Sequence, residues 1–160
     1  MGTWHIISLN SEVDVDANGA QVAWLKRDLA AHRNACVLAY WHKPRFSSGY
    51  HGNIRKVQPF WQALYDANAD VVLNGHDHDY ERFAPQTPTG VPDRARGIRE
   101  FVVGTGGAGL RAFSVIERNS EVRISQQHGV IRLSLPAGRY SWAFVGVDGR
   151  VKDSGAGSCH

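Results

Sequence analysis

The sequence lacks the features that mark several specialised classes of protein. Its longest uninterrupted apolar run, at 35–41, is much shorter than the roughly 20 residues that a membrane-spanning helix needs, so we predict no bilayer-crossing segment. The N-terminal region contains Glu12 and Asp14 and no basic stretch followed by an apolar one, so we expect no signal peptide in this chain. The only cysteines, Cys36 and Cys159, lack a CxxC spacing; they permit a disulfide but do not imply one.

A strong excess of one charge is also missing. The chain has 18 Lys and Arg residues against 15 Asp and Glu residues, a net charge of +3, and the basic residues are scattered instead of forming a run. Such a weak field gives no reason to expect binding to nucleic acid or to an anionic membrane. With 160 residues, 42% of them hydrophobic and 21% charged, the composition is that of one soluble globular domain with a buried core.

The first part of the chain has hydrophobic patterns that alternate between strand and helix. Short apolar runs indicate buried strands at 4–9, 36–41 and 69–73, and apolar residues at helical spacing indicate helices at about 19–33 and 57–68. The second of these helices fits a right-handed crossover between two parallel strands. We therefore predict a parallel βαβ arrangement for this part.

From Ile98 onward the helical periodicity disappears, and strands separated by turns follow. The expected strands lie at 98–103, 121–125, 130–135, 140–147 and 150–153. The pair Asp148-Gly149 is a hairpin turn signal, which indicates antiparallel pairing. We predict an α/β fold with a single domain, 1–160, in which 1–97 forms the parallel βαβ part and 98–160 the antiparallel part.

Histidine is the residue type that stands out, with 8 in the chain. His42 directly follows the second predicted strand, and His76 and His78 come just after the third. Because the carboxyl ends of parallel strands meet at one edge of a sheet, where α/β proteins place their ligands, we expect these imidazoles to converge. His76 and His78 can face one metal or two adjacent metals, while Asp77 and Asp79 point the other way and support the loop. The alternative is that each histidine is an ordinary polar loop residue.

The residues around these histidines match a known pattern. The string NGHDHDYER at 74–82, together with LAYWH at 38–42, resembles the calcineurin-like metallophosphoesterases and, within them, the purple acid phosphatase branch. This resemblance implies the C-terminal half of the α/β/β/α sandwich of that family. It also implies that His42 and His76 are ligands of one metal and that His78 is a ligand of another.

The same resemblance extends to His51, in the segment SSGYHGN. It implies that His51 contacts the substrate phosphate or protonates the leaving group, for which an imidazole is chemically suited near neutral pH. The alternative is a solvated loop histidine. For a complete family member the resemblance implies secretion and hydrolysis of a phosphate ester by a metal-bound hydroxide at a dinuclear centre. The metal is left open between iron, zinc and manganese, because imidazole suits all three.

Other blocks of the family pattern are missing from this sequence. It contains no Gly-Asp, and its only Gly-Asn, at 52–53, is followed by Ile54. Those blocks supply the carboxylates and the asparagine of the metal pair, so we expect this chain to form a homo-oligomer or to be complemented by an N-terminal half. The alternative is a non-catalytic metal-binding or structural fragment that self-associates. Carbohydrate binding by the aromatic strand 140–144 is a weaker alternative, since alternating aromatics in a sheet are usually core.

Two loops allow further interpretations. Residues 14–19 read D-x-D-x-N-G, the opening of a calcium loop, but Leu25 stands where the bidentate glutamate should be. We therefore favour an acidic loop that caps the following helix. The loop GTGGAG at 104–109 follows a strand, as a phosphate-binding loop does, but no helix-start pattern comes after it. We predict a plain tight turn there.

Overall fold

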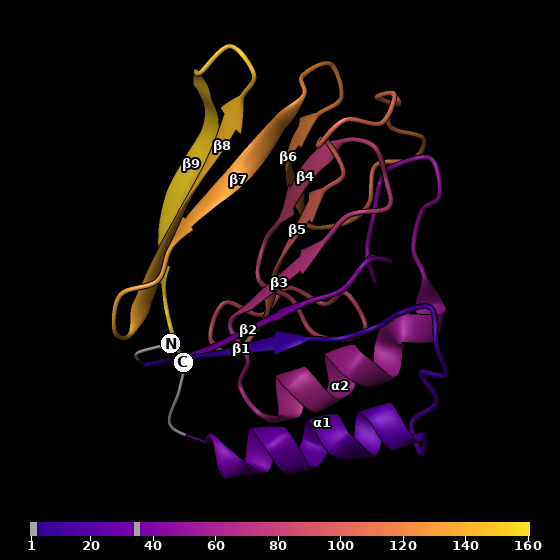
Figure 1. Ribbon diagram of the computed structural model, residues 1–160, viewed down its shortest axis with the longest axis vertical. Helices are drawn as coiled ribbons and strands as arrows, with labels where there is room; N and C mark the ends of the chain where they lie inside the picture. The colour runs from indigo at the N-terminus through magenta and orange to yellow at the C-terminus, as the bar shows by residue number, and fades with distance from the viewer. Residues whose placement is uncertain (1–2, 34–35) are drawn as a thin grey trace.

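The computed structural model describes residues 3–33 and 36–160, so Ala35, the first residue of the predicted apolar run, lies outside the described residues (Figure 1). The elements up to residue 74 are β1 (Trp4–Ser8), α1 (Ala20–Ala31), β2 (Cys36–Tyr40), a short 3-10 helix η1 (Arg55–Val57), α2 (Gln58–Asp66) and β3 (Val71–Asn74). The remaining strands are β4 (Tyr80–Phe83), β5 (Arg99–Val103), β6 (Ser120–Ile124), β7 (Gly129–Ser134), β8 (Arg139–Gly146) and β9 (Val151–Ser158).

The molecule has three layers (Figure 1). The middle layer is a six-stranded sheet with the order β1-β2-β3-β5-β4-β6; helices α1 and α2 cover one face, and the three-stranded sheet β7-β8-β9 covers the other. This arrangement confirms the predicted α/β fold with parallel and antiparallel parts. Neither α-helix in the described ranges is long and apolar enough to cross a membrane.

The strand predicted at 98–103 has both a parallel and an antiparallel neighbour, although we placed it in the antiparallel part. β5 pairs parallel with β3, with Arg99 opposite Val71, and antiparallel with β4. The division at residue 97 therefore falls inside the six-stranded sheet. The strand β4, over Tyr80–Phe83, was not predicted, because YERF has neither a continuous apolar run nor a full alternation. Its buried Glu81 obscures the pattern.

The start of α1 corrects the expectation for the acidic loop before it. The N-cap residue is Gly19, and no side chain caps the helix there. Asp14 instead accepts a hydrogen bond from the backbone N–H of Asp16, at 3.0 Å, within its own turn. Gln21 is turned away from the helix end and bonds to the backbone of Asn10. The loop is therefore closed on itself rather than used as a cap.

Two hydrophobic cores lie on the two faces of the middle sheet. Helices α1 and α2 bury one core with apolar residues that recur at helical spacing: Val22, Leu25, Leu29, Phe60, Trp61 and Leu64. On the other face the aromatic side chains of β8 pack against the sheet, and Phe144 stacks on Tyr80 with ring centroids 4.1 Å apart. Tyr140 and Trp142 are also buried there. These aromatics are core, so they are not free to bind a carbohydrate.

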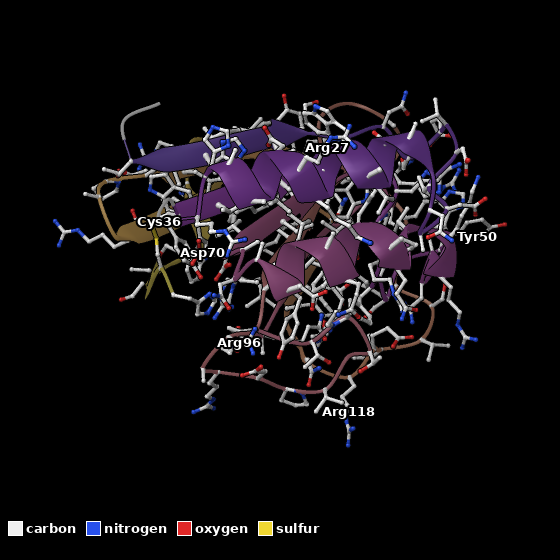
Figure 2. All side chains as sticks on the ribbon, turned by 90° about the horizontal axis from the view of Figure 1, so that it is seen from below. Arg27, Cys36, Tyr50, Asp70, Arg96 and Arg118 are labelled. Carbon is white, nitrogen blue, oxygen red and sulfur yellow. A yellow bond between two sulfur atoms is a disulfide. The ribbon has the colours of Figure 1, made fainter. Side chains whose placement is uncertain are left out.

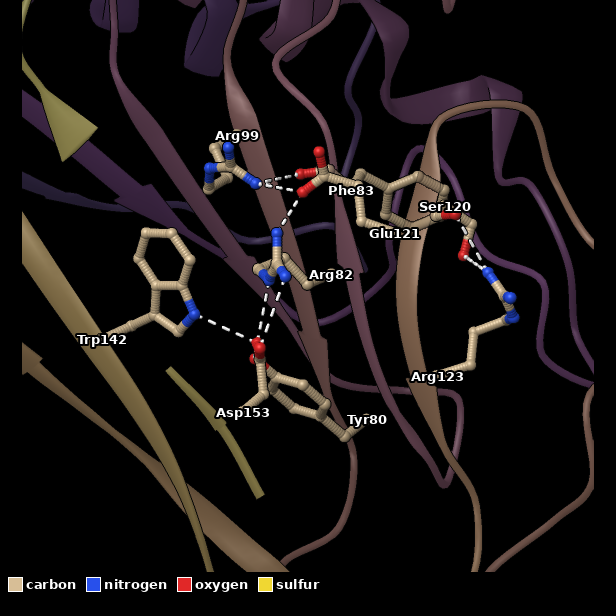
Figure 3. A network of polar contacts seen from close by, with 9 residues as sticks. All are labelled: Tyr80, Arg82, Phe83, Arg99, Ser120, Glu121, Arg123, Trp142 and Asp153. Atoms are coloured by element: carbon tan, nitrogen blue, oxygen red, sulfur yellow. Dashed lines mark hydrogen bonds and ion pairs between the residues drawn. The ribbon is translucent and has the colours of Figure 1, made fainter. Parts of the chain in front are cut away.

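A polar network crosses between the two sheets (Figure 3). Asp153 of β9 accepts hydrogen bonds from Arg82 Nε at 2.8 Å, from Tyr80 Oη at 2.7 Å and from Trp142 Nε1 at 3.0 Å. Burial opposes ionisation of Asp153, but the hydrogen bonds from Arg82 and Tyr80 outweigh it and lower the pKa of this carboxyl. The charged network thus fixes the small sheet in register over the large one.

A disulfide between Cys36 and Cys159 joins the start of β2 to the end of the chain, across a sequence separation of 123. It lies beside Asp70, at the end of the molecule opposite Tyr50 (Figure 2). The sequence spacing did not decide whether these two cysteines pair. In the fold they do, because β9 runs back alongside β8 and brings Cys159 to the start of β2.

Candidate metal centre

The parallel strands place two histidines, His42 and His76, at one edge of the large sheet. We call this edge, which comprises the ends of β2 and β3 with these two histidines, the carboxyl edge. Beyond the strands the two segments stay joined, because Gly75 N–H donates to the carbonyl of His42 at 3.0 Å. The side-chain amide of Asn74 donates to the carbonyl of Trp41, also at 3.0 Å. The position of each imidazole therefore follows from the parallel register of the sheet.

His42 and His76 face each other with a short distance between their ring nitrogens. Nε2 of His42 lies 3.1 Å from Nδ1 of His76, and the rings meet edge to face. Two nitrogens bound to one metal at about 2.0–2.1 Å each are roughly 3.0–3.4 Å apart. The observed separation therefore fits a shared metal ion. His76 also has a φ of 69°, a left-handed conformation that is costly for a residue with a Cβ.

His78 does not join this pair closely. Its Nδ1 lies 2.9 Å from the carbonyl oxygen of Gly109. Because a carbonyl only accepts, Nδ1 carries the hydrogen and Nε2 keeps its lone pair. Within the described residues, the groups of three or more ligand atoms that lie within 4.8 Å of one another do not include His42, His76 and His78. The expected convergence therefore holds for two of the three imidazoles.

His51 is brought to the same place by the loop after β2. Its ring lies over that of His76, with centroids 4.2 Å apart, and its Nε2 is 3.1 Å from Nη1 of Arg111. The Arg111 guanidinium also covers the ring of Tyr50, at 4.8 Å from its centroid. A guanidinium only donates, so His51 Nε2 accepts and its Nδ1 carries the proton in the neutral form.

Arg111 is the residue of this site that sequence reasoning missed. The glycine loop at 104–109 is a non-helical bend, in line with the expected lack of a following helix, and only Leu110 separates it from Arg111. The backbone N–H of Arg111 then donates to the carbonyl of His78 at 3.1 Å. One signal was available: a basic residue two positions after a glycine loop at a strand end. Nothing in the spacing related it to His51.

Buried carboxylates hold the loop that carries His51. Asp77 accepts the backbone N–H of His51 at 2.8 Å and the hydroxyl of Ser47. Glu81 accepts the backbone N–H of Ser48 at 2.8 Å together with the hydroxyl of the same residue. Asp77 thus points away from the histidines and supports the loop, as predicted. Glu81 has the same role.

Asp79 has a different environment, because neither of its buried oxygens has a hydrogen-bond partner. Burial, followed by the negative charges of Asp77 and Glu81, raises its pKa to about 8. Gly49 passes directly over this group: a Cβ on Gly49 would lie 2.5 Å from Cγ of Asp77 and 2.7 Å from Oδ2 of Asp79. Only glycine allows the loop to approach so closely.

The electrostatics of the centre favour neutral imidazole at His76. Burial lowers the pKa of this histidine, and the nearby His51 and His42 act in the same direction. Neutral imidazole is the form that binds a metal. The strained backbone, the facing nitrogens and the lowered pKa of His76 together describe a site whose geometry suits a transition metal.

Part of this sequence, and the fold, are similar to those of known proteins. No family model matches the sequence. Purple acid phosphatase 15 of Arabidopsis thaliana is 35% identical over 88 residues, which cover 51% of this chain and 16% of that protein. Purple acid phosphatase 23 of the same plant is 36% identical over 87 residues, covering 51% of this chain and 19% of that protein. This chain is related to the purple acid phosphatases.

Two solved structures share the fold. The purple acid phosphatase PPD1 from yellow lupin (Lupinus luteus) seeds superposes with a TM-score of 0.86 at 20% identity, covering 98% of this chain and 31% of the lupin chain. GAP50, the anchor in the inner membrane complex of Plasmodium, superposes with a TM-score of 0.81 at 17% identity, covering 98% of this chain and 50% of that chain. The three-layer architecture is therefore that of part of a purple acid phosphatase. The chain spans under a third of PPD1 and under a fifth of these two Arabidopsis relatives.

Proposed function

We propose that this chain supplies the histidine part of a metal-dependent phosphoesterase site. His42 and His76 hold one transition metal, His78 provides Nε2 for a second, and His51 with Arg111 faces the phosphate ester. The single observation that carries this proposal is the distance of 3.1 Å between the facing nitrogens of His42 and His76. The relationship to the purple acid phosphatases supports phosphate esters as the substrate class.

Each residue has a defined chemical task in this proposal. A bound metal makes hydroxide available near neutral pH and offsets the negative charge of the phosphate in the transition state. Arg111 donates hydrogen bonds to phosphate oxygens, since a guanidinium matches the geometry of this anion. His51 donates the hydrogen on Nδ1 to the substrate while its Nε2 stays bound to Arg111. Asp77 keeps His51 in place through the backbone of the loop.

The ligand set within this chain is rich in imidazole and poor in carboxylate. Asp77 is committed to the loop, and Asp79 lies buried beneath Gly49. We propose that the carboxylate ligands come from a complementing N-terminal half or from another copy of this chain. Exposed apolar side chains close to the carboxyl edge, Tyr40 and Val130, offer a surface for such a partner. These missing ligands decide between iron, zinc and manganese.

The disulfide supports a location of the protein outside the reducing cytosol. Cys36 and Cys159 are paired, and structural disulfides persist in oxidising compartments. We propose secretion of the parent protein on this ground and on its relationship to the purple acid phosphatases.

Native mass spectrometry tests the metal assignment, because it counts chains and metals in one spectrum. We expect His76→Ala to lose one transition metal per chain, whereas His128→Ala, which removes an imidazole outside the centre, keeps it. Equal metal content in the two variants contradicts the assignment of His76. An assay with a chromogenic phosphate monoester follows on the species that carries metal.

A second candidate function is metal binding without hydrolysis. One observation favours it: among the described residues, no carboxylate oxygen lies within 4.8 Å of the facing nitrogens of both His42 and His76. Under this alternative the chain keeps its metal and self-associates but does not release alcohol from the ester. If His51→Gln lowers the rate of ester hydrolysis while the metal content stays unchanged, the result supports the enzyme function. Metal uptake with no hydrolysis in any oligomeric state supports the alternative.

A further inference from the structure

A second group of side chains of the types that bind metals lies away from the carboxyl edge, between β1 and the end of α1. His5 belongs to β1, Asp28 lies near the end of α1, and His32 is its C-cap residue. One ligand atom from each of these side chains lies within 4.8 Å of the other two. We propose that His5, Asp28 and His32 bind a divalent transition metal ion, which fastens β1 to α1.

The side chains lie close together but must reorient to bind an ion. Nε2 of His5 lies 2.5 Å from Oδ2 of Asp28, and the rings of His5 and His32 stack with centroids 4.0 Å apart and 14° between their planes. Ligand atoms around a tetrahedral ion, with bonds of about 2.0–2.2 Å, lie roughly 3.3–3.6 Å apart. Binding therefore requires His5 and Asp28 to separate by about 1 Å and to give up the hydrogen that they now share. The two stacked imidazoles must also rotate apart, because a ligating nitrogen holds the metal in the plane of its own ring.

His32 has one ring nitrogen available for a metal. Its Nδ1 lies 2.7 Å from the carbonyl oxygen of Asp28, so Nδ1 carries the hydrogen and Nε2 keeps a free lone pair. Metal-binding histidines commonly donate their second ring nitrogen to a carbonyl or carboxylate, which fixes the ring. The helix backbone thus supplies the support that such a ligand needs.

The exposure of the group gives an ion both access and room for water. The side chains of His5, Asp28 and His32 are 17%, 21% and 48% exposed, respectively. Two imidazoles and one carboxylate suit Zn²⁺, Co²⁺ or Ni²⁺, whereas Mg²⁺ and Ca²⁺ prefer oxygen ligands. Because the three residues join a strand to a helix, the bound ion acts as a structural clamp with open positions filled by water.

The test isolates this site from the other histidines. The protein is purified without a histidine tag as the triple variant His42→Ala/His76→Ala/His78→Ala, and Zn²⁺ and Co²⁺ are titrated by calorimetry and visible absorption. We expect one ion per chain and the Co²⁺ absorption bands of a nitrogen and oxygen site. Adding Asp28→Asn or His5→Gln to this background weakens binding at least about 10-fold. Adding His128→Gln, the matched control, leaves it unchanged.

A stability measurement checks the clamp itself. In the triple variant, saturating Zn²⁺ raises Tm by about 5 °C, and the added His32→Gln abolishes this shift. If the triple variant does not fold, the same comparison is made in the unaltered chain, where His5→Gln must lower the metal count by one. No binding in the folded triple variant, or binding that His5→Gln and His32→Gln leave unchanged, overturns the proposal.

Discussion

The two ends of the parallel strands differ in how well their polar groups are satisfied. At the amino edge, which comprises the starts of β2 and β3 with Cys36 and Asp70, both oxygens of Asp70 are paired. They accept the backbone N–H of Val37 at 2.7 Å and that of His160 at 2.9 Å. The disulfide from Cys36 adds a covalent link to the same place.

The carboxyl edge has the opposite character. His76 has a left-handed backbone, and the carboxylate of Asp79 and the side-chain oxygen of Asn74 are buried without a hydrogen-bond partner. Strain and unpaired groups persist only where the surrounding structure enforces them, and they cluster at functional sites. The comparison teaches that the amino edge contributes stability, whereas the carboxyl edge gives up stability at the place where we propose that metal and phosphate bind.

The largest expected effect comes from removing the covalent link at the amino edge. We predict that Cys36→Ser/Cys159→Ser lowers the free energy of unfolding by about 3 to 5 kcal/mol, because the disulfide closes a long loop and restricts the unfolded chain. Urea unfolding followed by tryptophan fluorescence measures this loss. At the carboxyl edge, His42→Ala serves as the matched change and costs about 0.5 kcal/mol or less, since this side chain is exposed. Similar losses in the two variants would remove the contrast between the edges.

A smaller loss is expected at the loop that holds His51. Gly49→Ala places a methyl group 2.5 Å from Cγ of Asp77, so the loop must move away from the buried carboxylates. We predict a loss of about 1 to 3 kcal/mol and a displaced His51. Gly106→Ala is the control, because nothing lies within 4 Å of the place that its methyl group would occupy and its φ is not positive. Unfolding free energies measure the first effect, and imidazole chemical shifts of His51 measure the second; equal values for both variants would contradict the close fit.

The strain at the metal centre gives a prediction of the opposite sign. His76→Gly removes the Cβ from a backbone at φ 69° and should raise the free energy of unfolding of the metal-free protein by about 1 kcal/mol, while it abolishes metal binding at the carboxyl edge. Asn68→Gly is the control, because Asn68 has a similar φ of 56° and asparagine tolerates this conformation. The idea fails if glycine at position 76 destabilises the metal-free chain.

Much of the fold and part of the site follow from local sequence patterns. Helical spacing around Phe60 and Leu64 predicts α2, and apolar runs predict β1, β2 and β3, because burial of one face imposes its period on the sequence. The meeting of His42 and His76 follows in turn from the parallel arrangement of the strands that precede them.

What the sequence does not predict depends on contacts between distant segments. Arg111 reaches His51 through an irregular loop, and Cys159 lies beside Cys36 because β9 pairs with β8. Glu81 interrupts the apolar pattern of β4 because its carboxylate is paired with the loop at Ser48, which a local pattern does not record. The separation of His78 from His42 and His76 has the same origin, since the glycine loop holds its ring.

The smallest expected effect is a pH dependence at the amino edge. A hydrogen bond and the charge of Asp70 raise the pKa of His160, although partial burial opposes this shift. The folded state therefore holds this proton more tightly than the unfolded state does. The resulting stability is fully present below the ordinary histidine pKa of about 6.5 and is lost as the pH rises through the raised value.

Between about pH 6 and 8 we therefore expect the wild-type protein to lose a few tenths of a kcal/mol relative to His160→Gln, which has no such proton. Urea unfolding at several pH values measures the difference, with His128→Gln as the control for loss of an imidazole elsewhere. Asp70 keeps its hydrogen bond from the backbone N–H of Val37 in all of these proteins. The pH-dependent difference in stability is therefore due to His160 alone. A wild-type protein whose advantage over His160→Gln grows with pH would show that the proton is not held at the amino edge.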